Sequence, residues 1–464
     1  MTLATSKNHP SLLASPREDV ALASRRMRLP WLACLVGFAL FGCEKEQTVD
    51  EEPKELIRIG AALPFSGPRA STGIHLERAL MLAVEDVNRA GGVNGKQLSL
   101  KVRDSNSGSS RGRDEIIKLF DVDDISYLVG PEEDHLALSM VGEVKRRDVM
   151  QLLPSITSPS ITDSGTKGAW VRLVPSTLTM GCALATKANA DGITTTRTIA
   201  ERDDYHLELA TVFSSAFSSL GGRAHPTVSV ASDESSYKRA IAQVNRYTSD
   251  ATLMLAYPGT AATIIKEMSR GDEVRWYLSP MLRDDALLWN LPEGVVENSV
   301  GVSPSLSSNA ECDLDQASGG VGGVDPSTHC EADAADRFAK YYEDRWGTAP
   351  LLTAHFYYDA VIMLALGLEG AASDGHDDPS PQQLLPYITT HSEDDDRVAW
   401  DSLDEGLDLA GDGRPIHYVG AAGEYEFNRR GQNIRTLVDT WVITDGHQFA
   451  QRESVICSLA IGKN

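Results

Sequence analysis

Residues 56–104 constrain the fold of this chain more than any other segment. A strand is expected at Leu56–Gly60, a long amphipathic helix follows, and after a glycine-rich turn a second strand is expected at Leu98–Val102. Open α/β sheets hold their ligands at the carboxyl ends of their strands, so the loop after the first strand predicts a ligand-binding site. This loop brings three small residues to that edge of the sheet: Ser66, Ser71 and Gly73.

Expected strands and helices alternate along the rest of the chain, the pattern of parallel sheets that are covered by helices on both faces. The further expected strands are Ile125–Val129, Val149–Leu153, Thr196–Ala200, Thr227–Val230, Ala251–Leu255 and Trp276–Leu278. The expected helices between them are Leu136–Arg146, Leu178–Ala190, Leu207–Leu220, Tyr237–Tyr247 and Thr260–Met268. We therefore expect an α/β protein.

The length of the chain fits two domains behind an export segment. A charged stretch without apolar period, Glu44–Lys54, is typical of a tether. The expected divisions are a signal region at 1–42, with Met27 as an alternative start, a tether at 43–55, lobe one at 56–175 and 305–430, and lobe two at 176–304 and 431–464.

The export segment has the features of a bacterial lipoprotein signal. Arg25, Arg26 and Arg28 precede the apolar run Trp31–Phe41, which is shorter than the ~18 residues of a membrane span. The run ends in Leu40-Phe41-Gly42-Cys43, which resembles a lipobox, so Cys43 is the expected lipidation site and first mature residue. An ordinary secretory signal is the main alternative and a twin-arginine export signal at Arg25-Arg26 a remote one, and all three place the protein outside the cytoplasm.

Charge and cysteine content narrow the function classes. The formal net charge of −23 argues against nucleic-acid binding, which needs clustered basic residues. Export permits disulfides, and we expect Cys312 and Cys330, which flank a glycine-rich loop, to pair. Cys182 and Cys457 either form a second disulfide or remain buried free thiols.

Two segments of the opening unit carry a family resemblance. Pro64–Gly73 and Asn88–Gly95 resemble the motifs Pro-Leu-Ser-Gly-x-x-Ala-x-x-Gly and Asn-x-x-Gly-Gly-Ile-x-Gly of type I periplasmic binding proteins, specifically the branched-chain amino acid and amide group that serves ABC importers. The resemblance extends to the expected helices around Phe338–Gly347 and Tyr357–Ala360 and to the closing segment Gly423–Gly431. It implies the two-lobed type I fold, each lobe a mainly parallel sheet flanked by helices, with a hinge formed by several chain crossovers.

The resemblance also implies where a bound amino acid is held. Such a ligand presents a carboxylate, which suits hydroxyls and helix N-termini, and an ammonium, which suits a carboxylate or an aromatic face. The segment Pro154–Thr157 matches a family loop whose hydroxyls meet the ligand carboxylate, so Ser155 and Thr157 are expected contacts. The alternative is that both residues only cap the next turn.

Two other loops depart from the family pattern. The chain has Glu132-Glu133-Asp134 where the family places a hydroxyl residue, and Asp134 either complements a helix N-terminus or contacts a cationic or polar ligand. In the second lobe Met281 lies where the family has its ammonium-binding acid, and Asp284 is the expected replacement. Two tyrosines match positions of aromatic or polar family contacts, although ordinary packing is the alternative for both: Tyr205, expected in a loop, and Tyr257.

No catalytic motif, metal site or cofactor site is expected. The acidic runs at 376–378 and 391–396 lack EF-hand spacing, and neither a nucleophile elbow nor a His-Glu-x-x-His helix occurs. The sequence therefore favours a solute-binding lipoprotein rather than an enzyme, with an amino acid or amide, an ABC permease and the membrane as partners. The alternative is a lipoprotein that reuses the fold as a sensor or as a protein-contact regulator of cell-wall synthesis.

Overall fold

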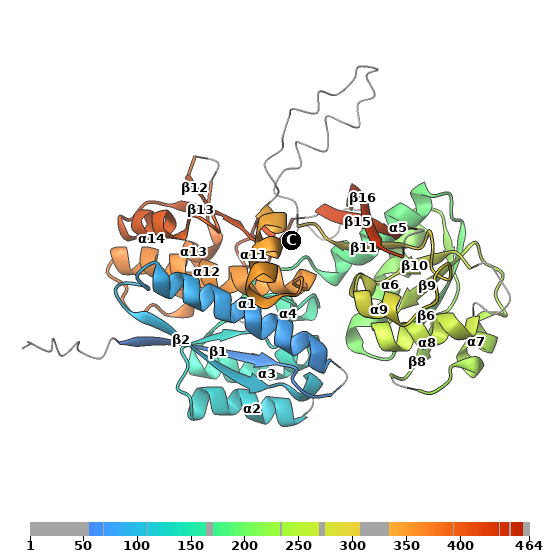
Figure 1. The fold of residues 1–464 in the computed structure, drawn as a ribbon, viewed down its shortest axis with the longest axis horizontal. Coiled ribbons are helices and arrows are strands. Elements are labelled where there is room, and N and C mark those ends of the chain that lie inside the picture. Colours follow the sequence, from blue (N-terminus) through green and yellow to red (C-terminus); the bar gives the residue numbers. More distant parts are fainter. Residues whose placement is uncertain are drawn as a thin grey trace, which may run out of the picture. The chain divides into compact units, whose positions relative to one another are not determined.

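The computed structural model describes residues 55–457 except 68, 109, 164–169, 233, 269–273, 307–333, 393, 436 and 445–446. The signal region, Cys43 and the expected Cys312–Cys330 pair therefore lie outside the described residues. Two large sheets and one small sheet organise the described part (Figure 1). Within these residues, no helix combines the length and the apolar character that crossing a bilayer requires.

The first large sheet has five strands, all paired in parallel, in the order β2-β1-β3-β4-β5. Its inner strands are apolar on both faces, as expected for a sheet that helices cover on both sides. Ile59 and Leu63 face one core, and Ala62 and Leu128 face the other. The strands are β1 (Leu56–Leu63), β2 (Gln97–Asp104), β3 (Tyr127–Val129), β4 (Met150–Leu153) and β5 (Trp170–Arg172).

Helices cover both faces of this sheet. The side chains of α1 and α12 share the core with Ile59 and Leu63, whereas α2 and α3 pack against the opposite face (Figure 1). The helices of this lobe are α1 (Ala70–Arg89), α2 (Ser110–Asp121), α3 (Asp134–Arg147), α4 (Ser160–Asp163), α11 (Ala334–Trp346), α12 (Leu352–Ser373), α13 (Pro381–Thr389) and α14 (Leu403–Gly411), with a 3₁₀ turn, η1, at Asn106–Gly108.

A small three-stranded sheet joins the same core. It consists of β12 (Asp396–Ala399), β13 (Ile416–Gly420) and β14 (Gly423–Glu424). Asp359 of α12 fastens it: Tyr418 and Tyr425 donate their hydroxyls to the carboxylate at 2.7 and 2.6 Å, and the N–H groups of Ala421 and Ala422 donate at 2.7 and 2.8 Å. Asp359 is fully buried, so these four donors take the place of water.

The second large sheet has eight strands, parallel from β6 to β11 and closed by two antiparallel strands. Helices α5 and α6 share a core with one face, and α7, α8 and α9 share a core with the other. Its strands are β6 (Thr195–Glu201), β7 (Arg223–Ala224), β8 (Val228–Val230), β9 (Ala251–Leu255), β10 (Trp276–Leu278), β11 (Val300–Pro304), β15 (Leu437–Ile443) and β16 (Phe449–Ile456). Its helices are α5 (Thr177–Ala190), α6 (Asp204–Ser219), α7 (Lys238–Val244), α8 (Pro258–Met268) and α9 (Asp285–Trp289), with a 3₁₀ turn, η2, at Pro280–Leu282.

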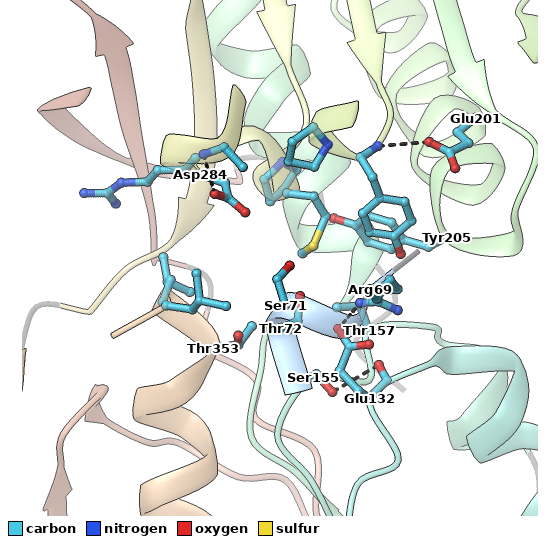
Figure 2. Close-up of a pocket in the computed structure, with 18 of the residues that line it drawn as sticks. Arg69, Ser71, Thr72, Glu132, Ser155, Thr157, Glu201, Tyr205, Asp284 and Thr353 are labelled. Atoms are coloured by element: carbon cyan, nitrogen blue, oxygen red, sulfur yellow. Dashed lines mark hydrogen bonds and ion pairs between the residues drawn. The ribbon is translucent and has the colours of Figure 1, made fainter. Parts of the chain in front are cut away.

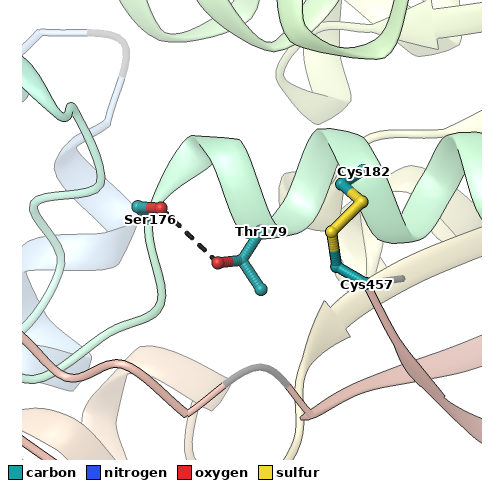
Figure 3. Close-up of a disulfide and its surroundings, with 4 residues drawn as sticks. All are labelled: Ser176, Thr179, Cys182 and Cys457. Atoms are coloured by element: carbon teal, nitrogen blue, oxygen red, sulfur yellow. Dashed lines mark hydrogen bonds between the residues drawn. A yellow bond between two sulfur atoms is a disulfide. The ribbon is translucent and has the colours of Figure 1, made fainter. Parts of the chain in front are cut away.

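Among the described elements, the chain passes from the first large sheet to the second after β5 and leaves the second after β11. It returns to the second large sheet after β14, the last strand of the small sheet. The fold is thus the expected type I arrangement of two helix-covered, mainly parallel sheets. A disulfide joins Cys182 of α5 to Cys457, the residue after β16 (Figure 3). Of the two expected alternatives, a second disulfide or two buried free thiols, the structure has the disulfide. The exact lobe boundaries stay a prediction.

Candidate ligand-binding site

A cavity of about 340 Å³ opens at the carboxyl ends of strands from both large sheets. Its volume lies in the range of small-molecule sites, and its wall mixes apolar and polar side chains. The wall includes residues that follow β1, β3 and β4 on one side and β6, β9 and β10 on the other (Figure 2). A smaller cavity of about 180 Å³ shares much of this wall, including Glu132, Ser155, Thr157, Tyr205 and Tyr257.

The loop after β1 is fixed from behind by Asp104. The backbone N–H groups of Phe65 and Ser66 donate to its Oδ1 at 2.9 and 3.2 Å, and the Ser66 hydroxyl donates to its Oδ2 at 2.6 Å. Burial raises the pKa of Asp104, but these hydrogen bonds outweigh burial and hold that pKa below its usual range. Ser66 is therefore turned toward Asp104 and is not part of the wall of either cavity.

Helix α1 begins directly at the cavity. Its first turn brings Ser71 and Thr72 into the wall. The helix packs so closely on the loop that a Cβ on Gly73 would lie 2.2 Å from the carbonyl oxygen of Pro64, which explains a glycine at this position of the motif. The N-terminus of α1 has neither an acidic residue in its first turn nor a side-chain cap.

Arg69, the residue before α1, is held by two contacts. Its guanidinium forms an ion pair with Glu132, and it lies over the ring of Tyr257 with its Cζ 4.8 Å from the ring centroid. Side-chain exposure is only 15% for Arg69 and 4% for Glu132, so the pair is shielded from water. Figure 2 shows the two side chains pointing toward each other at the cavity.

The other two acids of this loop are also buried. Asp134 begins α3 and accepts hydrogen bonds from the N–H groups of Thr157 and Ser158 at 2.9 and 3.2 Å and from the Thr157 hydroxyl at 3.1 Å. Glu133 accepts one from Ser105 at 3.0 Å. Burial raises the pKa of both Glu133 and Asp134, although their hydrogen bonds oppose it. Asp134 therefore organises the loop after β4 and reaches only the wall of the smaller cavity.

The hydroxyls of Ser155 and Thr157 contact protein groups inside the wall. The Ser155 hydroxyl donates to the carbonyl of Glu132 and lies near the hydroxyl of Tyr357, both at 3.2 Å. The Thr157 hydroxyl donates to Asp134 and accepts from the hydroxyl of Thr177 at 3.0 Å. The single hydroxyl proton of Thr157 is thus committed to Asp134, which favours the structural interpretation of that hydroxyl.

The opposite wall is aromatic and acidic. Tyr205 lies in the first turn of α6, not in a loop as expected, because Asp203 caps the helix two residues earlier. His206 packs edge-on between Tyr205 and Tyr257, with 4.8 Å between ring centroids in each case, and its Nδ1 lies 2.7 Å from Asp203 Oδ2. Glu201 accepts from the backbone N–H of Tyr257 at 3.1 Å and so fixes the position of this ring.

The segment after β10 also contributes to the wall. Met281 is a lining residue, as is Asp284, which caps α9 by accepting from the N–H of Ala286 at 2.8 Å. Burial raises the pKa of Asp284. Arg283 also contributes to the wall but donates to the Ser303 hydroxyl at 3.0 Å.

The large cavity brings together six of the eight expected contacts: Ser71, Ser155, Thr157, Tyr205, Tyr257 and Asp284. The sequence interpretation missed Arg69, Thr72 and Glu201. Arg69 occupies a variable position of the loop motif, but three consecutive acids in the neighbouring loop were a signal that a buried cation was needed nearby. In the part of the chain that the structure describes, no group of three histidine, cysteine or acidic side chains is placed to hold a metal ion.

Two helix-covered parallel sheets, with one cavity at the carboxyl ends of strands from both, define a two-lobed α/β binding protein. Its sequence matches the profile of the periplasmic binding protein family over residues 56–417. The chain therefore belongs to this family of extracytoplasmic solute-binding proteins.

Relatives by sequence match only a part of the chain. Leu/Ile/Val-binding protein homolog 1 of Brucella abortus is 23% identical over 109 residues, and Leu/Ile/Val-binding protein BraC3 of Rhizobium johnstonii is 28% identical over 109 residues. Each match spans 24% of this chain and 29% of the relative, under a third of its length.

Solved structures match most of the chain. A leucine binding protein from Thermotoga maritima has a TM-score of 0.66 at 16% identity, covering 86% of this chain and 99% of the other. A solute binding protein from R. palustris in complex with benzoate has a TM-score of 0.66 at 16% identity, covering 86% and 96%. At these identities the structures establish the shared fold.

Proposed function

We propose that this protein captures a small polar solute, an amino acid, an amide or a similar compound, in the 340 Å³ cavity and delivers it to the permease of an ABC importer. The observation that supports this proposal most strongly is the convergence of polar and aromatic side chains on one cavity at the carboxyl ends of both sheets. Repeated crossing between the sheets suits closure around a ligand.

The proposed ligand surroundings are six residues of the cavity wall and one residue beside it, Asp134: the six are Ser71, Ser155, Thr157, Tyr205, Tyr257 and Asp284. Ser66 supports the loop after β1 through its hydrogen bond to Asp104. The names of the relatives support this solute class, since they include Leu/Ile/Val-binding proteins and an R. palustris protein in complex with benzoate. A lipid on Cys43 would hold the protein at the outer face of a membrane, close to its permease.

A thermal-shift screen of the purified protein against amino acids, amides and polyamines tests the solute-binding proposal. A ligand at 100 times its Kd stabilises by about 2.7 kcal/mol, which raises Tm measurably. The Ser71→Trp variant places a large ring in the cavity wall and should lose the shift. Ser218→Trp, at an exposed helical serine outside the wall, is the matched control and should keep it.

One observation favours a second function. Met281 lines the cavity where the family resemblance implies an ammonium-binding acid, and a thioether cannot replace a carboxylate in that role. A chain that has lost its solute could still act as a sensor or as a protein-contact regulator of cell-wall synthesis. A flat screen across all solute classes would favour this second function over transport.

A further inference from the structure

Arg69 lies directly before α1 and is fixed in the cavity wall, with guanidinium donors left for a ligand. Only one of its guanidinium nitrogens has a hydrogen-bond partner among the described residues, and that partner is Glu132. The side chain is mostly buried yet lines both cavities, so its other N–H donors remain available to a ligand. A guanidinium presents a rigid fork that matches the two oxygens of a carboxylate.

The N-terminus of α1 adds to this preference. The helix dipole favours an anion at such a terminus, and α1 has neither an acid in its first turn nor a side-chain cap. The N–H groups of Ala70 and Thr72 donate to the carbonyls of Gly67 and Arg69, so the terminus contributes mainly through its dipole. Ser71 and Thr72, in its first turn, line the cavity beside Arg69 (Figure 2). The guanidinium, the two hydroxyls and the positive end of the helix dipole thus lie at one end of the cavity.

Each acid in the loop next to Arg69 has at least one partner, although one oxygen of Glu132 and one of Glu133 have none among the described residues. Glu132 is paired with Arg69, Asp134 accepts three hydrogen bonds, and Glu133 accepts one from Ser105. Their effect is to hold the guanidinium in place. Across the cavity, Glu201 and Asp284 disfavour a second negative charge on the ligand.

We propose that the ligand is a monocarboxylate whose carboxylate binds to Arg69 and the N-terminus of α1, rather than to the hydroxyls of Ser155 and Thr157. This inference rests on the proposed solute-binding function and adds which protein groups bind the carboxylate of the ligand. The hydroxyl of Thr157 stays with Asp134 and Thr177, and the hydroxyl of Ser155 stays with the Glu132 carbonyl and Tyr357. Arg69 is then the residue that selects acids over amides.

Matched acid and amide pairs test the ligand class. Isothermal titration calorimetry of the purified protein would compare leucine with leucinamide and benzoate with benzamide, and any acid found in the screen with its amide. We expect the acid of a binding pair to bind at least about tenfold more tightly, the usual effect of a hydrogen bond to a charged group. An amide that binds as tightly as its acid, or more tightly, would overturn the inference while leaving solute binding intact. Absence of binding by every solute class would instead overturn the proposed function.

Variants of the Arg69–Glu132 ion pair test the role of Arg69 in ligand binding. Arg69→Lys keeps the charge but loses the fork, and the double variant Arg69→Met, Glu132→Gln removes both charges so that neither is left buried alone. Both should lose at least about tenfold in affinity for the acid while unfolding cooperatively in urea without ligand. Arg78→Met is the matched control, because Arg78 lies on α1, the helix that Arg69 precedes, but contacts Trp346 and Thr348 instead of the cavity. Retention of wild-type affinity by Arg69→Lys and by the double variant would overturn the assignment.

Discussion

Two buried carboxylate regions in the same lobe differ in how completely the protein satisfies them. Asp359 receives four donors, two tyrosine hydroxyls and two backbone N–H groups, and both of its oxygens are bonded. In the loop after β3, by contrast, one oxygen of Glu132 and one of Glu133 are buried without a hydrogen-bond partner among the described residues. Both regions contain acids that are less than a tenth exposed.

This difference separates a structural role from a functional one. A fully satisfied buried carboxylate fixes one arrangement of the elements around it, here α12 and the small sheet. An incompletely satisfied group costs free energy, and such costs persist where binding needs them. The comparison predicts that changes at Asp359 affect stability most, whereas changes at the cavity affect affinity most.

The largest expected effect is on stability at Asp359. Asp359→Ala removes the acceptor of two hydroxyls and two backbone N–H groups at once, so we expect a loss of at least about 3 kcal/mol in the free energy of unfolding. Urea denaturation followed by circular dichroism measures it. Asp124→Asn is the control, because Asp124 is 88% exposed, its ion pair with Arg58 is worth at most about 1 kcal/mol, and asparagine tolerates its left-handed backbone conformation. Equal losses in the two variants would contradict the structural role of Asp359.

The pH dependence of stability is a second, intermediate effect. Burial raises the pKa of Asp359 to about 6, although its four hydrogen bonds oppose this. Between about pH 4 and pH 6 the folded state keeps a proton that the unfolded state has released, so the contribution of Asp359 to stability decreases as pH rises. The decrease is at most about 1.4 kcal/mol per pH unit.

Asp359→Asn lacks this titration and isolates its contribution. The difference in unfolding free energy, wild type minus variant, should fall as pH rises from about 4 to 6 and then level off. Urea titrations at several pH values measure this difference. A difference that stays constant over that range would show that Asp359 does not titrate there in the folded protein.

The smallest effect is expected at Thr157, which belongs to the cavity wall but is bonded like a structural residue. Thr157→Val keeps the shape and removes the hydroxyl that joins Asp134 and Thr177, so stability should fall by about 1 kcal/mol. Affinity for the acid ligand should change less than about threefold, as measured by calorimetry. A tenfold loss of affinity with unchanged stability would instead indicate that the ligand carboxylate contacts the Thr157 hydroxyl.

The sequence predicted the alternating part of the fold well because its signals are local. Apolar strands such as Ala251–Leu255 and Trp276–Leu278 were predicted at their observed bounds. Strand β11 was not predicted, because Val300–Pro304 mixes valines with glycine, serine and proline, and its antiparallel partner β15 comes more than a hundred residues later. Its Gly301 has no local turn role; a Cβ there would lie 2.1 Å from the ring of Trp441.

The site was predicted in outline but not in its charge arrangement. The motif placed Ser71 and Tyr257 near one cavity, because the carboxyl ends of parallel strands share an edge of the sheet. The pairing of Arg69 with Glu132 depends on β1 and β3 being neighbours, which strand order in the sequence does not reveal because β2 lies between them along the chain. Internal bonding of the Thr157 hydroxyl likewise depends on tertiary packing.

The Cys182–Cys457 disulfide also constrains when the protein can mature. The two cysteines are 275 residues apart, so the second thiol is made and exported long after the first. The cytoplasm keeps thiols reduced and the periplasm oxidises them. The link can therefore form only after both Cys182 and Cys457 have left the cytoplasm, and it attaches the end of β16 to α5, the helix whose Met180 lines the cavity. Formation of this disulfide thus marks a chain in which both α5 and β16 have been exported.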